Sequence, residues 1–187
     1  MLKLVKRNYI LRLAVVCYNY SKNIIRGTKM KLYLDMNIYN RIFDDQTQLR
    51  IRFETMAIDI IMELAEKGIH ELVWSFMLFD ENMGNPYSYR RKYVELLSEA
   101  CVEEVKPSIK IKELAHSIMK VSKVKAKDSL HLACAVYAEC DCFITCDDRF
   151  IRTIKANNTG MHDTIGNIKI MYPVDFLREE MKIDVIE

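Results

Sequence analysis

The chain has 187 residues and a mass of 22.0 kDa, a length typical of one domain. Half of the residues are hydrophobic, 29% are charged, and only five are Gly and three Pro, which excludes a disordered, collagenous or low-complexity protein. No run of about 18 apolar residues occurs, so the sequence predicts a soluble globular protein without a membrane span.

The net charge of +2 is unevenly distributed along the chain. Residues 1–29 hold seven Lys or Arg and no Asp or Glu, and subtracting them leaves 21 basic and 26 acidic side chains in residues 30–187. This second part is net acidic, so any affinity for nucleic acid must come from a local basic patch.

Residues 1–29 form a basic N-terminal extension whose apolar stretch, from Tyr9 to Tyr18, is interrupted by Arg12. One interpretation is a secretory signal, but no small-x-small cleavage site follows the stretch. The preferred interpretation starts translation at Met30, which makes the extension a gene-model artefact or a loosely attached arm. Residues 30–187 are then expected to form one domain.

Six cysteines are present, four of them between Cys134 and Cys146. A chain of this length needs no disulfide framework, and the Cys140-x-Cys142-x3-Cys146 spacing departs from the paired C-x2-C spacing of structural zinc sites. We therefore expect reduced thiols and a cytoplasmic location.

From Met30 onward, short apolar runs alternate with longer helical patterns, which is typical of a parallel sheet covered by helices. The predicted elements, in chain order, are strand 32–34, helix 53–64 ended by Gly68, strand 72–75, a helix that carries Glu81, helix 90–100, strand 101–105, helix 111–119, helix 130–137, strand 142–145, a helix that Asp147 begins, strand 168–171 and a helix opened by Pro173. The fold class is therefore α/β with about five parallel strands.

Four acidic residues follow strands or begin helices in this pattern. Asp35 follows the first strand, Asp147 lies two residues after the fourth, Glu81 lies on the helix after the second, and Asp128 opens a helix. Because ligands bind beyond the carboxyl ends of the strands in open α/β sheets, we expect the four carboxylates to meet at one edge.

Such a cluster requires a counter-charge, since two like charges about 4 Å apart repel by roughly 4 kcal/mol at an effective dielectric of 20. Mg²⁺ or Mn²⁺ would provide it, because these ions prefer carboxylate and water oxygens. Two such ions can generate hydroxide and stabilise both oxygens of a phosphodiester displacement, so the cluster predicts hydrolysis of a nucleic-acid backbone.

A different interpretation is structural. Asp35, Asp128 and Asp147 each precede a predicted helix, and Asp is a favoured N-cap residue. Glu81 is equally consistent with a solvated helix position.

The order of four motifs favours the functional interpretation: Leu34-Asp35-Met36-Asn37, then Ser75 to Glu81, then Asp128-x-x-His131-Leu132-Ala133-x-Ala135, then Phe143-Ile144-Thr145-x-Asp147. Residues 30–178 resemble a PIN-domain ribonuclease, with the last two motifs the most specific part. The resemblance implies a three-layer α/β/α fold and an endoribonuclease that leaves a 3′ hydroxyl and a 5′ phosphate.

The resemblance also implies roles for individual residues. Asp35, Glu81, Asp128 and Asp147 would be the catalytic ligands of Mg²⁺ or Mn²⁺, Thr145 would orient the last acid or a water, and Asn37 would be a polar partner of the first acid. Asp80 and Asp148 remain alternatives to their neighbours Glu81 and Asp147.

RNA contacts are expected from basic residues beside these motifs, chiefly Lys125, Lys127, Arg149 and Arg152. Tyr87 and Tyr89 adjoin Arg90 and Arg91, but the preferred interpretation of these tyrosines is a helix start with one buried Tyr. His131 lies within i,i+3 reach of Asp128 and is treated as structural.

Small proteins with this resemblance are often VapC-type toxins that an antitoxin neutralises, and members of the family commonly form homodimers. The sequence leaves both the antitoxin and the oligomeric state open. The sequence does not choose between a toxin and an RNA-processing enzyme, nor does it indicate the RNA target. An aspartyl phosphatase is disfavoured because Asn37 stands where its second Asp would be. The remaining alternative is a catalytically inactive PIN-like module that binds RNA or protein.

Overall fold

The computed structural model describes residues 29–180, except for the side chains of residues 158, 159 and 180. Apart from Lys29, the expected N-terminal extension lies outside these residues. Within the described range, no helix has both the length and the apolar character needed to cross a membrane.

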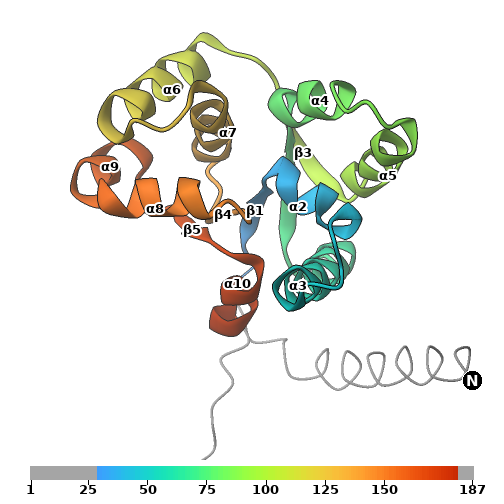
Figure 1. Cartoon of the computed structure of the whole chain (residues 1–187). Helices are drawn as coiled ribbons and strands as arrows, with labels where there is room; N and C mark the ends of the chain where they lie inside the picture. Colours follow the sequence, from blue (N-terminus) through green and yellow to red (C-terminus); the bar gives the residue numbers. More distant parts are fainter. Residues whose placement is uncertain (1–28, 181–187) are drawn as a thin grey trace, which may run out of the picture. The chain divides into compact units, whose positions relative to one another are not determined.

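Five parallel strands form one sheet in the order β3-β2-β1-β4-β5 (Figure 1). Their bounds are β1 Lys31–Leu34, β2 Glu71–Ser75, β3 Cys101–Val105, β4 Cys142–Ile144 and β5 Lys169–Met171. All five predicted strands are present, and each end lies within one residue of its predicted position.

The helices cover both faces of this sheet, with α3 and α5 on one side and α6, α7 and α9 on the other (Figure 1). In the described chain they are α2 Met36–Asn40, the 3-10 helix η1 Arg41–Phe43, α3 Leu49–Glu66, α4 Phe76–Met83, α5 Ser88–Ser98, α6 Ile109–Ser122, α7 Ala126–Tyr137, α8 Asp148–Ala156, α9 Asn158–Ile165 and α10 Pro173–Glu180. Sequence periodicity missed α2, η1 and α9, because elements of three to eight residues are too short to show a helical repeat.

The chain order explains where a site can form. The chain starts in the central strand β1, moves outward through α3 to β2 and through α4 and α5 to β3, and then crosses back through α6 and α7 to β4 on the other side of β1. The direction of winding therefore reverses between β1 and β4. Open α/β sheets bind ligands at the carboxyl ends of the strands beside such a reversal.

The core is centred on β1, where Leu32, Tyr33 and Leu34 have no exposed surface. The Tyr33 ring stacks on Phe143 of β4, with 5.3 Å between the ring centroids. Because Leu34 is in register with Ile144, the residues that follow the two strands emerge side by side at the same edge.

The apolar pattern of α3 is wider than its buried face. The helix begins four residues before the predicted start, and Phe53 and Met56, which belong to the predicted pattern, are 56% and 37% exposed. Ala57, Ile61 and Leu64, which belong to the same pattern, are buried. The pattern thus identified the helix and these three buried positions, but it was wrong for Phe53 and Met56, which face solvent.

Candidate active site at the carboxyl edge of the sheet

Asp35 is fixed by the backbone at the end of β1. Its N–H donates to the carbonyl of Ile144 at 2.9 Å, and its Oδ1 accepts a hydrogen bond from Met36 N at 2.8 Å as the N-cap of α2. Burial raises the pKa of the Asp35 carboxyl, and although His131 and the Thr145 hydroxyl act to lower it, the net pKa is raised. The folded environment therefore makes ionisation of Asp35 less favourable than it is in water.

Thr145 and Asn37 hold the second oxygen of Asp35. The Thr145 hydroxyl donates to Asp35 Oδ2 at 2.7 Å, and Asn37 Nδ2 donates to the same oxygen at 2.5 Å and to Thr145 Oγ1 at 2.9 Å. Asn37 Oδ1 accepts from Cys146 N at 2.9 Å, and Thr145 Oγ1 accepts from Asp147 N at 3.1 Å. One network thus joins the end of β1 to the loop after β4.

Asp147 is the N-cap of α8. Its Oδ1 accepts hydrogen bonds from the backbone N–H groups of Arg149 and Phe150 at 2.7 and 2.9 Å. Its Oδ2 makes no hydrogen bond with a described residue, so capping engages one carboxylate oxygen and leaves the other available to a ligand. The capping and functional interpretations of Asp147 are therefore compatible.

Asp148 points to a different part of the molecule. Both of its oxygens accept hydrogen bonds from the guanidinium of Arg50 on α3, at 2.7 and 2.5 Å. This bidentate pair lowers the pKa of the Asp148 carboxyl. Of the two adjacent acids, Asp147 is thus the one that joins the network with Thr145.

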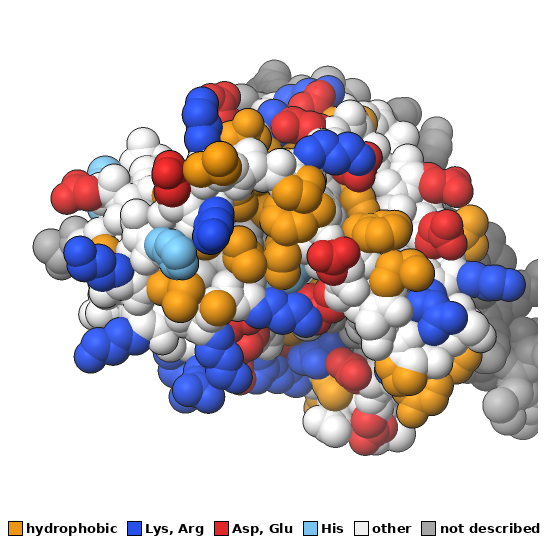
Figure 2. Space-filling model, turned by 90° about the horizontal axis from the view of Figure 1, so that it is seen from above, with side chains coloured by type: hydrophobic (Ala, Val, Ile, Leu, Met, Phe, Trp, Pro, Cys, Tyr) orange, Lys and Arg blue, Asp and Glu red, His pale blue; other side chains and the backbone are white. Residues whose placement is uncertain are grey.

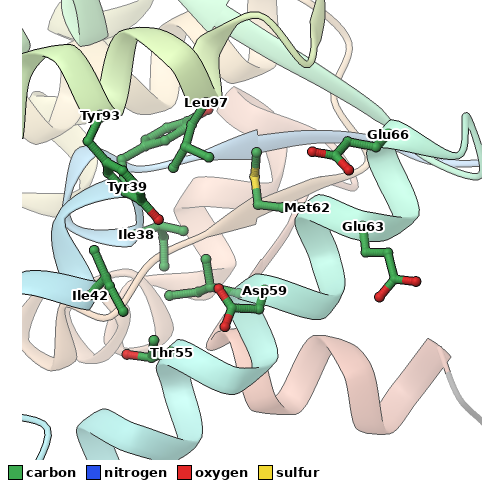
Figure 3. Close-up of a pocket in the computed structure, with 11 residues that line it drawn as sticks. Ile38, Tyr39, Ile42, Thr55, Asp59, Met62, Glu63, Glu66, Tyr93 and Leu97 are labelled. Carbon is green, nitrogen blue, oxygen red and sulfur yellow. The ribbon is translucent and has the colours of Figure 1, made fainter. Parts of the chain in front are cut away.

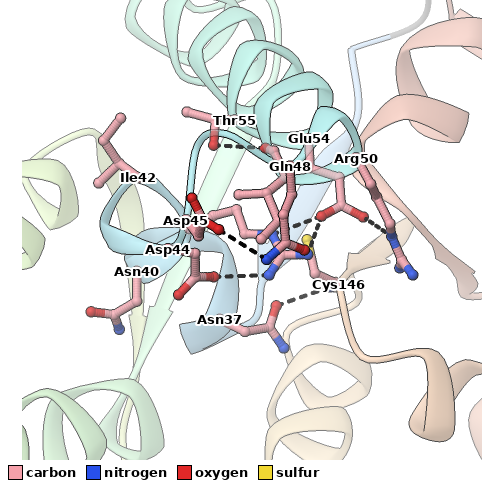
Figure 4. A network of polar contacts seen from close by, with 12 residues as sticks. Asn37, Asn40, Ile42, Asp44, Asp45, Gln48, Arg50, Glu54, Thr55 and Cys146 are labelled. Atoms are coloured by element: carbon pink, nitrogen blue, oxygen red, sulfur yellow. Dashed lines mark hydrogen bonds and ion pairs between the residues drawn. The ribbon is translucent and has the colours of Figure 1, made fainter.

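Arg50 also extends the network into α3 (Figure 4). Glu54 on that helix is 3% exposed and accepts hydrogen bonds from Arg50 Nε at 2.8 Å and Arg41 Nε at 2.7 Å. Two guanidinium groups therefore pair with one buried carboxylate, which offsets part of the free-energy cost of burying its charge. Figure 4 shows Cys146, which precedes Asp147, next to this cluster. The loop that carries Asp147 is thereby supported from the side of α3.

Glu81 lies on α4 and is held by side chains of α7. Its Oε1 lies 2.8 Å from Lys127 Nζ and its Oε2 lies 3.0 Å from His131 Nε2. Burial raises the pKa of Glu81, but the hydrogen bonds from His131 and Lys127 outweigh burial and the net pKa is lowered. The adjacent Asp80 is exposed, so Glu81 is the member of this pair that turns toward α7.

Asp128 is the third residue of α7, which begins at Ala126 with Lys125 as the N-cap residue. The expectation that Asp128 opens its helix as an N-cap is therefore wrong, because the helix starts two residues earlier. Its carboxylate makes no hydrogen bond or ion pair with a described residue. Burial raises the pKa of Asp128, and the negative charges of Asp147 and Glu81 raise it further, so these acids act on one another through space.

His131 is part of a buried chain of hydrogen bonds, and it makes no hydrogen bond with Asp128 although it lies within i,i+3 reach of that residue. Its Nδ1 lies 2.8 Å from the Tyr33 hydroxyl, which lies 2.7 Å from Ser75 Oγ. His131 is 2% exposed, so this chain fixes the ring that contacts Glu81. Sequence analysis missed Tyr33, because a tyrosine in an apolar strand has the same pattern as a core residue.

The four basic residues expected to contact RNA differ in their surroundings. Lys125, Lys127, Arg149 and Arg152 are all exposed, and Lys127 also pairs with Glu81. Figure 2 shows the face above the sheet, where Lys and Arg side chains lie next to acidic ones and beside a patch of hydrophobic side chains. The carboxyl edge therefore combines acidic and basic groups with apolar surface.

Comparison with known proteins places this arrangement in a known fold. No family model matches the sequence, and no curated protein matches it. Among solved structures, the chain is similar to one of VapBC2 from Rickettsia felis, which was determined bound to a DNA fragment from its promoter. The TM-score is 0.51 and the identity 14%, over 76% of this chain and 98% of the other. The chain has the PIN-domain fold.

A structure of FitAcB from Neisseria gonorrhoeae also matches, with a TM-score of 0.48 and 13% identity over 76% of this chain and 97% of the other. The PIN fold expected from the sequence motifs is therefore confirmed by the VapBC2 match. In this PIN fold, Asp35, Glu81, Asp128 and Asp147 come from four separate elements around the carboxyl edge of the sheet.

Among the described residues, several hollows lie outside the predicted site, and two of them lie between helices. One, of about 220 Å³, lies between α2, α3 and α5, where apolar side chains such as Ile38 and Met62 meet Asp59 and Glu66 at the rim (Figure 3). The other, of about 590 Å³, is lined mainly by apolar side chains of α6 and α7. Neither is lined by any of the four predicted ligands.

The five cysteines of the described residues are free thiols. Cys146 adjoins Asp147, but burial and the neighbouring carboxylate of Glu54 raise the pKa of its thiol. A thiolate nucleophile at this position is therefore disfavoured.

Proposed function

We propose that this protein is a metal-dependent endoribonuclease that hydrolyses RNA phosphodiester bonds. The observation that carries the proposal is the convergence of carboxylates from four separate elements at the carboxyl edge of a PIN fold. Their charges are coupled, because the pKa of Asp128 is raised by Asp147 and Glu81 in addition to burial. A divalent cation would relieve this repulsion.

The donor set has the chemistry that Mg²⁺ or Mn²⁺ requires, since it offers carboxylate oxygens and no sulfur or nitrogen ligand is needed. In the structure, however, no three His, Cys, Asp or Glu side chains of the described residues are grouped closely enough to hold a metal ion together. Glu81 is instead paired with Lys127 and His131. The Lys127 ammonium thus supplies the counter-charge that a cation would otherwise provide.

Each part of the network has a role in the proposed reaction. Thr145 and Asn37 orient the carboxylate of Asp35. The Oδ2 of Asp147 and the carboxylate of Asp128, which have no hydrogen-bond partner within residues 29–180, are the groups best able to accept a ligand. A bound metal ion would activate water and stabilise charge on the phosphate. Lys125, Lys127, Arg149 and Arg152 would contact the phosphates of the RNA.

An antitoxin partner and a cytoplasmic location belong to the same proposal. The sequence motifs resemble those of VapC-type toxins, and VapBC2 has the same fold. The apolar surface beside the site provides area that a partner protein would bury. Co-expression with the product of the adjacent gene, followed by a cleavage assay, would test this part, and inhibition is the expected result.

The central experiment is cleavage of a labelled single-stranded RNA by the full-length protein, with Mn²⁺ and with a chelator. We expect cleavage only with Mn²⁺, and its loss in Asp35→Asn, which keeps the size of the side chain but removes its charge and replaces one accepting oxygen with an amide NH2. Thermal unfolding with Mn²⁺ is the parallel measurement, since an ion that binds only the native state raises Tm.

The second candidate function is a catalytically inactive module that binds RNA or protein. The ion pair of Lys127 with Glu81 favours it, because it neutralises one predicted ligand without a metal. A folded protein that neither cleaves RNA nor shows a higher Tm with millimolar Mn²⁺ would support this module and contradict the nuclease.

A further inference from the structure

Aromatic rings gather around one guanidinium at the start of α5. The Arg90 guanidinium carbon lies 4.7 Å from the ring centroid of Tyr87, 4.9 Å from that of Phe43 and 5.8 Å from that of Tyr89. Phe43 comes from η1, so the cluster joins two segments distant in sequence. We call Phe43, Tyr87, Tyr89 and Arg90 the Arg90 platform.

The two tyrosines of the platform are exposed. Tyr87 and Tyr89 have 51% and 56% of their surface accessible, and their ring centroids lie 5.8 Å apart with an angle of 46° between the planes. The expectation that one of them is buried at the start of a helix is therefore wrong. Exposed rings beside a guanidinium offer free π-faces to a flat ligand.

Hydrogen bonds fix the segment that carries the platform. Tyr87 N donates to Asn85 Oδ1 at 3.1 Å, and Asn85 Nδ2 donates to Asn40 Oδ1 of α2 at 3.4 Å. Arg91 Nη1 donates to the Asn85 carbonyl at 2.6 Å, and its own carbonyl accepts from the buried Asn82 at 3.1 Å. The tyrosine backbone is thus ordered before a ligand binds, which lowers the entropic cost of binding.

The charge of the platform suits a polyanion. Within the described residues, Arg90 contacts aromatic rings and the Tyr89 hydroxyl, and Arg91 contacts the Asn85 carbonyl, but neither forms an ion pair with an acidic side chain. Both guanidinium groups therefore keep their full charge for an external partner. An RNA phosphate is a partner of the required charge, and an adjacent unpaired base has the required flat surface.

The platform also lies within reach of the candidate active site. Tyr87 lies six positions after Glu81, so the two Cα atoms are at most about 21 Å apart even if the chain were fully extended. At about 3.4 Å per phosphate of a stacked strand, this distance corresponds to about six nucleotides or fewer. One short single strand can therefore contact both.

We propose that the Arg90 platform binds an unpaired base of single-stranded RNA, which stacks on Tyr87 or Tyr89 while Arg90 and Arg91 contact the phosphates. This proposal rests on the proposed function, since it assigns the class of substrate that the candidate active site receives. The platform would favour single-stranded over duplex RNA, because the bases of a duplex are not free to stack on a side chain.

Fluorescence anisotropy with the full-length protein in EDTA tests the platform without cleavage. The probes are a labelled ten-nucleotide oligoadenylate, a ten-base-pair RNA duplex and a ten-unit abasic strand that carries phosphates but no bases. We expect Kd for oligoadenylate to rise about tenfold or more in Tyr87→Ala/Tyr89→Ala, with the abasic strand and the duplex unaffected. The matched control, Tyr87→Phe/Tyr89→Phe, keeps the rings and should retain the wild-type affinity.

Tyr87→Lys provides a second test, since it adds a positive charge and removes a ring. Stacking predicts weaker binding of oligoadenylate, whereas contact with phosphates alone predicts tighter binding. Three results would each contradict the proposed role of the Arg90 platform: unchanged affinity in the alanine variant, an equal loss of affinity for the abasic strand, or no RNA binding by the wild-type protein. Unchanged affinity in the alanine variant would favour a protein as the partner of this surface. Because binding is measured without metal, a failure of the nuclease proposal would appear separately, as absent cleavage with Mn²⁺.

Discussion

The candidate site has two halves that are held in different ways. In the strand half, Asp35, Thr145 and Asp147 follow β1 and β4, and hydrogen bonds to backbone groups fix them. In the helix half, Glu81 and Asp128 lie on α4 and α7, where Glu81 is held only through side chains and Asp128 makes no hydrogen bond with a described residue.

This difference indicates which half can adapt to a ligand. The register of the sheet fixes the positions of residues at strand ends, so a movement of Asp35 would disturb the pairing of β1 with β4. An ion pair between side chains such as Lys127 and Glu81 can rearrange at small cost, since Lys127 is 54% exposed. We therefore expect the strand half to be rigid and the helix half to respond to metal and RNA.

The largest expected effect is that of Asp147→Asn on cleavage. Asn caps helices as well as Asp does, so the hydrogen bonds to Arg149 and Phe150 should persist and Tm should stay unchanged. Loss of the charge should lower the cleavage rate by about 100-fold or more, because even residues that only support a metal ligand contribute 10- to 100-fold. Rate and Tm are measured on the same preparation, with Asp147→Ala, which also loses the cap, as the comparison. Full activity in Asp147→Asn would leave Asp147 with capping as its only role.

Thr145→Val should remove the hydrogen bonds that hold the strand half together and so destabilise the protein. The hydroxyl donates to Asp35 and accepts from Asp147 N, and Thr145 has no exposed surface. Leaving these buried groups unsatisfied should reduce the free energy of unfolding by about 1–3 kcal/mol. Urea unfolding measures this, and Thr145→Ser, which keeps the hydroxyl, should lose less. If valine were tolerated without loss of stability, the strand half would not depend on this network.

A smaller effect concerns pH and tests the helix half. Burial, together with Asp147 and Glu81, raises the pKa of Asp128, so the folded metal-free protein holds this proton more tightly than the unfolded chain. Binding of this proton by Asp128 adds to the free energy of unfolding. The contribution is fully present below the ordinary Asp pKa of about 4, and it is lost as the pH rises through the raised pKa of Asp128 in the folded protein. Asp128→Asn should therefore flatten the fall in stability over this window, as measured by unfolding in EDTA. The exposed Asp80→Asn is the matched control, and an equal change in both variants would contradict the coupling.

The smallest effect is expected for Lys127→Gln. Removing the ammonium 2.8 Å from Glu81 eliminates the group that competes with a cation, so Mn²⁺ affinity should rise about threefold, while stability changes by less than about 1 kcal/mol. Isothermal titration measures the affinity, and Lys110→Gln on α6, which removes an exposed charge that makes no ion pair with a described residue, is the control. Weaker Mn²⁺ binding in Lys127→Gln would indicate that Lys127 orders Glu81 for the metal instead of competing with it.

The sequence by itself determined the strands and the positions of Asp35 and Thr145. Their apolar runs are short and end at polar residues, and in a parallel sheet such residues emerge together at the carboxyl edge whatever the helices do. The order of the motifs likewise predicted the PIN fold that the VapBC2 match confirms.

Only the tertiary structure decided how the side chains are paired. His131 was treated as structural and lies within i,i+3 reach of Asp128, but packing of α7 against the sheet and α4 turns its ring to Tyr33 and Glu81. The local sequence around Tyr87 and Tyr89 is compatible with buried or exposed side chains. In the folded protein both are exposed, in the cluster with Phe43 and Arg90. Local sequence sets the period and ends of an element, but the partner of a side chain depends on elements far away in the chain, which no local pattern contains.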